Sequence, residues 1–71
     1  MKKYYAARKQ SNGEYAYVSE IHPGLIRETI SADDAIGYDN AEAALNLAEI
    51  ATFTSGVEYA GIEIETIIKE L

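Results

Sequence analysis

Short apolar-polar alternations open this chain and predict a β-hairpin. The runs Lys3 to Lys9 and Glu14 to Glu20 are rich in Tyr, Ala and Val, and Asn12-Gly13 lies between them. Asn-Gly is a strong hairpin signal because a type I′ turn needs positive φ at both central residues. With these two residues at the tip, the pattern pairs Arg8 with Tyr17.

Each face of the hairpin in that register holds a mixture of aromatic, small and basic residues. One face carries Tyr4, Ala6, Arg8, Tyr15 and Tyr17, and the other carries Tyr5, Ala7, Lys9, Ala16 and Val18. Because both faces are partly apolar, the pattern leaves open which one meets the core.

Beyond the hairpin, the chain alternates breaks with short regular segments. His22-Pro23-Gly24 interrupts the second strand, since Pro lacks a ladder donor and Gly frees the backbone. Leu25 to Ile30 predicts a third strand. Ser31 then predicts the N-cap of a short helical turn that runs to about Ile36 and ends at Gly37.

A longer helix is predicted to begin after Asp39, whose carboxylate can accept from the N3 amide. Alanines and leucines then recur at helical spacing, and Ser55-Gly56 ends the pattern. The alanine-rich stripe implies close approach to a sheet. Ile50 and Phe53 lie off that stripe, towards the polar side, and either wrap into the core or form a patch that awaits a partner.

The tail from Val57 to Leu71 fits two patterns. Alternating Ile and Glu favour a strand, whereas Ile64, Ile67, Ile68 and Leu71 also fit helical spacing. We expect the strand, because β-branched residues suit a pleated surface. The whole chain, residues 1–71, is therefore predicted to be one α+β domain of order β-β-β-α-β, a small antiparallel sheet packed on one alanine-rich helix.

Charge is distributed unevenly over the 71 residues, whose net charge is −6. The first strand carries four cations and no anion: Lys2, Lys3, Arg8 and Lys9. The remainder holds only Arg27 and Lys69 against all 12 carboxylates. If the last strand pairs with the first, these cations face Glu58, Glu63 and Glu65, in exposed pairs that set register more than stability.

So small a chain has a thin core, and domains of this size usually add disulfides, a metal or a partner subunit. The chain has no Cys and one His, so thiolate and multi-histidine metal sites are excluded. Self-association is the remaining means of stabilisation, and we expect a homodimer. No apolar run is long enough for a membrane span, and Tyr4 to Gln10 supplies no signal-peptide core, so we expect a cytoplasmic protein.

Two groups of polar residues resemble chemical sites only in part. His22 with Glu20 could form an acid-base pair, but no identified nucleophile or second imidazole accompanies them. The carboxylates near Asp34 and Asp39 fail the spacing of a calcium loop and are explained by helix caps. We therefore expect no catalytic residue, no metal, no cofactor and no small-molecule substrate.

The stretch Ala35-Ile36-Gly37-Tyr38-Asp39-Asn40-Ala41-Glu42-Ala43-Ala44 follows a Tyr-rich Asn-Gly hairpin and precedes an Ile/Glu tail. In this arrangement the chain resembles small uncharacterised proteins of Gram-positive bacteria and their phages. The resemblance implies an aromatic-Asp step that opens an alanine-rich helix on a small sheet, and a phage or prophage setting. It implies no catalytic residues.

The function expected from these observations is a non-enzymatic protein-interaction module that self-associates and binds another protein. The expected interface residues are apolar or aromatic: Tyr15, Tyr17, Ile50, Phe53 and Tyr59. One alternative is a single-stranded nucleic-acid binder that uses the Tyr, Lys and Arg side chains of the hairpin, although the net charge disfavours polyanions. Another is an acidic DNA mimic that occupies a basic host protein through residues such as Glu42, Glu49 and Glu58.

Overall fold

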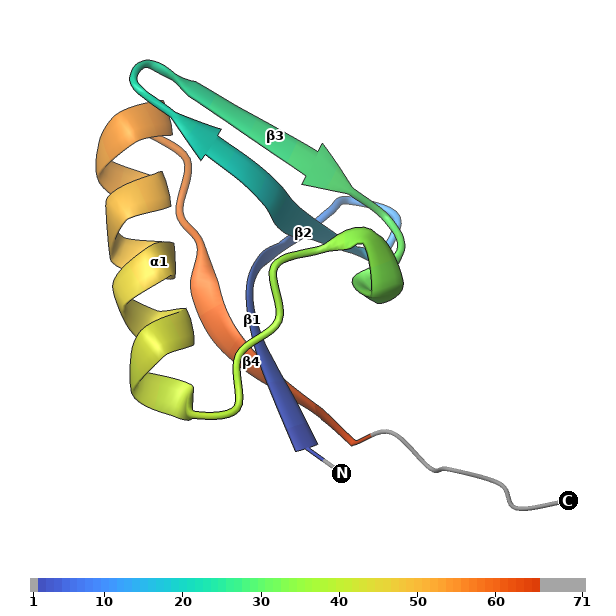
Figure 1. Cartoon of the computed structure of the whole chain (residues 1–71). Coiled ribbons are helices and arrows are strands. Elements are labelled where there is room, and N and C mark those ends of the chain that lie inside the picture. The colour runs from blue at the N-terminus through green and yellow to red at the C-terminus, as the bar shows by residue number, and fades with distance from the viewer. Residues whose placement is uncertain (1, 66–71) are drawn as a thin grey trace, which may run out of the picture.

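The computed structural model of this chain describes residues 2–65, which form one antiparallel sheet and one long helix (Figure 1). The elements in chain order are β1 (Lys2–Lys9), β2 (Tyr15–His22), β3 (Leu25–Thr29), the 3-10 turn η1 (Ala32–Asp34), α1 (Ala41–Ser55) and β4 (Ala60–Glu65). The strand order is β3-β2-β1-β4, and α1 packs against β1 and β4. The α+β class and the order β-β-β-α-β are confirmed.

The hairpin turn is one residue longer than predicted. The Gln10 N–H donates to the Glu14 carbonyl at 2.8 Å, so the loop holds three residues and not two. Gly13 has a φ of 89°, but Asn12 does not have a positive φ; its side chain instead accepts from the Glu14 N–H at 2.9 Å. This is the three-residue hairpin in which glycine occupies the left-handed position, rather than a type I′ turn.

The longer loop moves every β2 side chain to the opposite face relative to β1. Arg8 faces Ala16, not Tyr17, and the predicted register is therefore wrong. Tyr15 and Tyr17 instead share a face with Tyr5. The Tyr5 and Tyr17 rings meet edge to face with centroids 5.6 Å apart, and the Tyr15 ring lies 6.2 Å from that of Tyr17.

The main core lies between α1 and the other face of the sheet, although Tyr5 and Ala7 are also buried on the face of the tyrosines. Small side chains bring the helix close to the strands, as the alanine stripe predicts. The buried core residues are Ala6, Val18, Leu47, Ala48, Ala51 and Tyr59. Burying a large aliphatic side chain such as Leu47 stabilises the fold by about 1.5–3 kcal/mol.

The segment before α1 joins the sheet where β1 and β2 separate. The Ile36 N–H donates to the Val18 carbonyl at 3.1 Å, and Tyr38 exchanges two backbone hydrogen bonds of 2.9 Å with Tyr4. Ile36 and Tyr38 also pack against the core. The segment therefore supplies the strand hydrogen bonds that β2 does not make at this end of β1.

The turn before this segment is shorter than predicted, since it spans only η1, and the Ser31 side chain makes no cap hydrogen bond. Gly37 does not end a helix. It lies against the Tyr5 ring, where an added Cβ would come within 3.1 Å of a ring carbon. The close approach of backbone to ring explains the glycine.

The N-cap of α1 is Asn40, and not Asp39 as predicted. The Asn40 side-chain oxygen accepts from the Ala43 N–H at 2.8 Å. Asp39 instead accepts from the Lys3 ammonium group at 2.8 Å. The helix ends at Gly56, whose φ of 75° confirms the predicted end of the helix.

The last strand pairs antiparallel with the first over six residue pairs, from Lys2–Glu65 to Ala7–Ala60. The strand interpretation of the tail is confirmed for Ala60–Glu65. Residues 57–59 of the predicted tail precede the strand, and residues 66–71 lie outside the described residues.

Candidate protein-interaction surfaces

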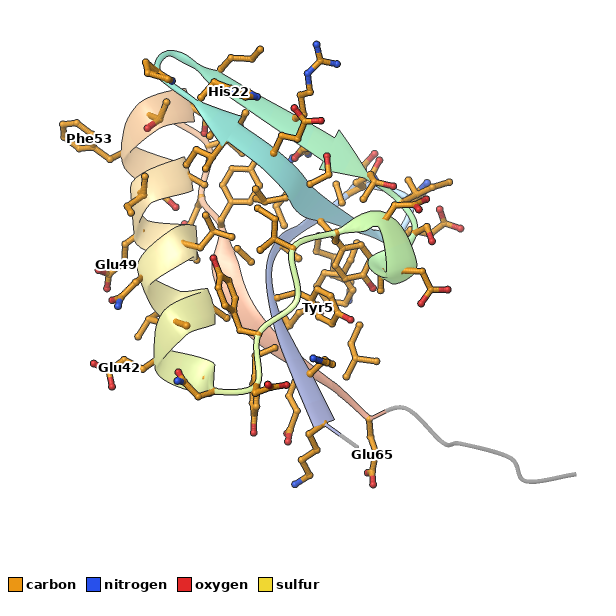
Figure 2. The ribbon with its side chains drawn as sticks, in the orientation of Figure 1. Tyr5, His22, Glu42, Glu49, Phe53 and Glu65 are labelled. Atoms are coloured by element: carbon orange, nitrogen blue, oxygen red, sulfur yellow. The ribbon has the colours of Figure 1, made fainter. Side chains whose placement is uncertain are left out.

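The outer side of α1 carries the most exposed large apolar side chain in residues 2–65. Phe53 is 93% exposed and Ile50 is 54% exposed, whereas Leu47 and Ala51 on the inner side are buried. Figure 2 shows Phe53, Glu49 and Glu42 along the side of α1 that points away from the sheet. The alternative in which Ile50 and Phe53 wrap into the core is therefore wrong.

A shallow groove runs beside Phe53 and across the C-terminal end of α1. We call it the Phe53 groove, and it is lined by Glu49, Thr52, Phe53, Gly56, Glu58 and Tyr59. Two exposed carboxylates, those of Glu49 and Glu58, border its aromatic wall. No Lys or Arg occurs in the sequence between Arg27 and Lys69. The groove therefore combines an apolar anchor with negative charge.

Tyr59, expected at an interface, is instead a core residue with 8% exposure. Its hydroxyl donates to Glu28 at 2.6 Å, and Glu28 accepts from Arg8 at 2.5 and 2.9 Å. Sequence reasoning missed this network because its three members come from β1, β3 and the segment before β4. It satisfies the polar end of a buried tyrosine, which otherwise costs free energy.

The network shifts the ionisation of its members. The hydrogen bond from Arg8 holds the pKa of the Glu28 carboxyl below its usual range, despite partial burial. Burial, followed by the hydrogen bond to the Glu28 carboxylate, raises the pKa of the Tyr59 hydroxyl. The pKa of the Arg8 guanidinium is raised by its hydrogen bonds to Glu28. All three groups are thus fixed in their neutral-pH charge states.

Carboxylates engage three of the four cations of β1. The pairs and their nitrogen–oxygen distances are Lys2 with Glu63 at 3.2 Å, Lys3 with Asp39 at 2.8 Å and Arg8 with Glu28 at 2.5 Å. Pairing across to β4 was predicted and is confirmed for Glu63, whereas Lys3 and Arg8 use other elements. Lys9 is exposed at the end of β1.

The true register changes which cations of β1 share a face with Tyr15 and Tyr17. Tyr15, 38% exposed, and Tyr17 lie on the sheet face opposite the core, while Arg8 lies on the core side and is held by Glu28. Stacking of bases on tyrosine rings requires cations on the same face to hold the phosphates. Strand alternation brings Lys3 and Lys9, but not Arg8, to the tyrosine face, and the Lys3 ammonium group is engaged by Asp39.

His22 and Glu20 form a surface hydrogen bond near the end of β2. The His22 Nε2 lies 2.9 Å from a Glu20 carboxylate oxygen, and Arg27 lies 3.7 Å from the same oxygen. The hydrogen bond to His22 lowers the pKa of the Glu20 carboxyl. Within residues 2–65, no three His, Asp or Glu side chains gather as metal ligands would. Both side chains are exposed to water, so the pair does not form an enclosed site.

A second, smaller groove lies between the N-terminal half of α1 and β4, and sequence patterns did not predict it. We call it the β4 groove, and it is lined by Tyr4, Ala41, Ala44, Leu45, Gly61, Ile62 and Glu63. Leu45, on its helix side, is 49% exposed. Gly61 leaves the floor open because it has no side chain.

Comparisons with known proteins add no relative from which a function could be transferred. No protein-family model matches this chain, and neither a curated protein nor a solved structure matches it. No helix within residues 2–65 has the length and apolar character needed to cross a membrane. The surfaces described above are therefore the basis for a proposed function.

Proposed function

We propose that this protein is a non-enzymatic protein-interaction module that binds a basic protein partner through the Phe53 groove. The observation that carries the proposal is the 93% exposure of Phe53 on the helix side opposite the core. A phenyl ring in water contributes nothing to this fold, whereas its burial by a partner is worth about 1.5–3 kcal/mol. Aromatic anchors of this kind dominate the energetics of protein interfaces.

Charge complementarity specifies the partner. An Arg or Lys side chain can lay its stem on the Phe53 ring and place its charged group between Glu49 and Glu58, which border the groove. Apolar side chains beside that cation would cover Ile50. Such a partner carries a basic residue next to an apolar one on a single surface.

The same charges disfavour a second copy at this groove. A twofold contact places each surface against itself, so that Glu49 and Glu58 of both copies would crowd one interface. The predicted homodimer stays a prediction, and we propose that its contact is a different surface. The phage or prophage setting likewise stays a prediction.

Site-directed photo-crosslinking in the source cell tests the proposal. We expect p-benzoylphenylalanine at position 53 to crosslink one discrete, basic protein, which mass spectrometry of the adduct identifies. The matched control places the same amino acid at Ile30, which is 73% exposed but distant in the chain from the groove. The same adduct from both positions, or none from position 53, would contradict the proposal.

The acidic-mimic alternative makes a different prediction for the same adduct. Its three carboxylates are exposed: Glu42 lies in the first turn of α1, and Glu49 and Glu58 line the Phe53 groove. A mimic depends on their charge and is indifferent to the aromatic ring. With crosslinking moved to Ile50, the proposal predicts loss of the adduct in both Phe53→Ser and the double variant Glu49→Lys/Glu58→Lys. Loss in the charge variant alone would favour the mimic.

A further inference from the structure

β4 is an edge strand, and its free hydrogen-bonding groups can be assigned. On one side it pairs with β1, and no strand within residues 2–65 covers the other side. The Tyr4 N–H and carbonyl are both taken by Tyr38, so the Tyr4–Glu63 pair is not itself hydrogen-bonded. By alternation, the N–H and carbonyl groups of Glu63 and Gly61 point away from β1, to the open edge.

These outward groups lie at the β4 groove. Gly61 and Glu63 line it, and the exposed Leu45 of α1 lies on its other side. An added Cβ at Gly61 would meet the Leu45 backbone at 3.5 Å, so helix and strand already approach closely there. An open strand edge beside an apolar helix groove is the arrangement in which proteins capture extended segments by strand addition.

We infer that β4 captures an extended segment of another protein, which adds to the sheet as a fifth strand. Its backbone can exchange four hydrogen bonds with Gly61 and Glu63. The side chain opposite Gly61 points to the helix side of the sheet and fills the space beside Leu45, so it is apolar. The side chain opposite Glu63 lies beside a carboxylate, so it is basic.

A second copy of this chain fits the edge poorly. Twofold pairing of Glu63 with Gly61 would put a carboxylate into the apolar space beside Leu45. Twofold pairing of Glu63 with itself would oppose like charges, which is destabilising. A chain of net charge −6 adds repulsion to either arrangement. The occupant is therefore a segment of a different protein.

This site is independent of the Phe53 groove. The two grooves share no lining residue: one is bordered by residues 49–59 and the other by residues 4, 41–45 and 61–63. Failure of either one leaves the other standing.

Nuclear magnetic resonance with a synthetic peptide tests the inference. The probe, acetyl-Thr-Lys-Thr-Leu-Thr-Lys-Thr-amide, places leucine opposite Gly61 and lysine opposite Glu63 on the helix side. We expect its binding to shift the amide signals of both protein residues and to slow their hydrogen exchange about tenfold or more. Shifts confined to the Phe53 groove, or no binding at millimolar peptide, would overturn the inference.

Methylated peptides provide the first matched control. Methylation of the leucine nitrogen removes the hydrogen bond to Gly61 and is expected to weaken binding about tenfold. Methylation of the adjacent threonine nitrogen, which points away from β4, is expected to change affinity much less. Equal losses for the two peptides would show that strand pairing does not occur.

A pair of protein variants provides the second. Glu63→Pro removes an outward N–H that β1 does not use, and proline is tolerated at such edge positions. Glu63→Ala loses the same contact to Lys2 but keeps the N–H. We expect Glu63→Pro to bind the peptide about tenfold more weakly than Glu63→Ala, and equal affinities would contradict the inference. The methylated peptides decide the matter if Glu63→Pro does not fold. Concentration-dependent protection of Gly61 without peptide would instead identify a second copy.

Discussion

The inner and outer sides of α1 differ in what they bury. The inner side buries only Leu47 and small alanines, whereas the outer side leaves Phe53 93% exposed. A folding domain of this size would gain most by placing its largest apolar residue inside. The close helix–sheet packing leaves no space for it, since the sheet side presents Ala6, Val18 and the ring of Tyr59.

This difference separates stability from interaction within one helix. The inner residues fix the fold by filling volume, so each atom removed creates a cavity. The outer residues contact water and cost the isolated fold little if changed. The following substitutions test that division, from the largest expected effect to the smallest.

Leu47→Ala is expected to destabilise the protein by about 2–5 kcal/mol, because it leaves a cavity between α1 and the sheet. Small domains have a total stability of about 5 kcal/mol, so the variant is measured in the presence of a stabilising osmolyte. Urea denaturation followed by circular dichroism provides the measurement. If Leu47→Ala lowered the free energy of unfolding as little as a surface substitution does, the inner side of α1 would not be the side that stabilises the fold.

Glu28→Ala is expected to cost about 1–2 kcal/mol, since it leaves the Tyr59 hydroxyl and the partly covered Arg8 without their acceptor. The matched control is Glu20→Ala, which removes an exposed carboxylate from the same sheet. We expect the control to change the free energy of unfolding by less than about 0.5 kcal/mol. Equal effects of the two variants would show that the Arg8–Glu28–Tyr59 network does not stabilise the fold.

The same network predicts a pH dependence with two limits. The folded pKa of Glu28 lies below the ordinary value of 4.5, so its contribution is present above that pH and is lost as the pH falls through the folded value. The folded pKa of Tyr59 lies above 10.0, so its contribution is complete below pH 10.0 and is lost as the pH rises through the folded value. The free energy of unfolding can be measured by urea denaturation at a series of pH values. Plots of this free energy against pH for wild type and Tyr59→Phe should therefore differ in shape at high pH. Parallel curves would contradict the assignment.

Phe53→Ser is expected to change the free energy of unfolding by less than about 0.5 kcal/mol, while abolishing the crosslinked adduct from Ile50. This is the smallest stability effect and the sharpest test of the division. Light scattering on wild type and Phe53→Asp adds a test of self-association. If the predicted dimer forms, we expect the substitution to leave its mass unchanged, because the acidic outer side of α1 is not the contact. Dissociation of the dimer would place the contact there.

The sequence predicted the elements but not the way their faces meet. Hydrophobic periodicity and the Gly56 cap located α1 to within a residue or two, and the Ile/Glu alternation located β4. The side chains that meet across elements depended on the register of the hairpin. Asn12-Gly13 is compatible with both a two-residue and a three-residue hairpin turn. The three-residue turn pairs Arg8 with Ala16 instead of Tyr17, and it places the β2 side chains on the faces opposite to those predicted.

The candidate sites show the same division. The position of Phe53 and Ile50 off the alanine stripe predicted either burial in the core or an exposed patch. Their exposure agrees with the exposed patch. Tyr59 was misassigned because its acceptor, Glu28, is 31 residues away in sequence. The β4 groove was missed because it depends on where β4 lies relative to α1, which local patterns do not encode.

By itself, the sequence determined the order of the elements, the ends of the helix and the concentration of positive charge in the first strand, because each follows from backbone propensity and composition within a few residues. Only the tertiary structure decided which sheet face packs on α1, how Ile36 and Tyr38 extend the sheet beside β1, and which strands form the edges of the sheet. These depend on pairing between residues far apart in the chain, where a shift of one position reverses the direction of every side chain.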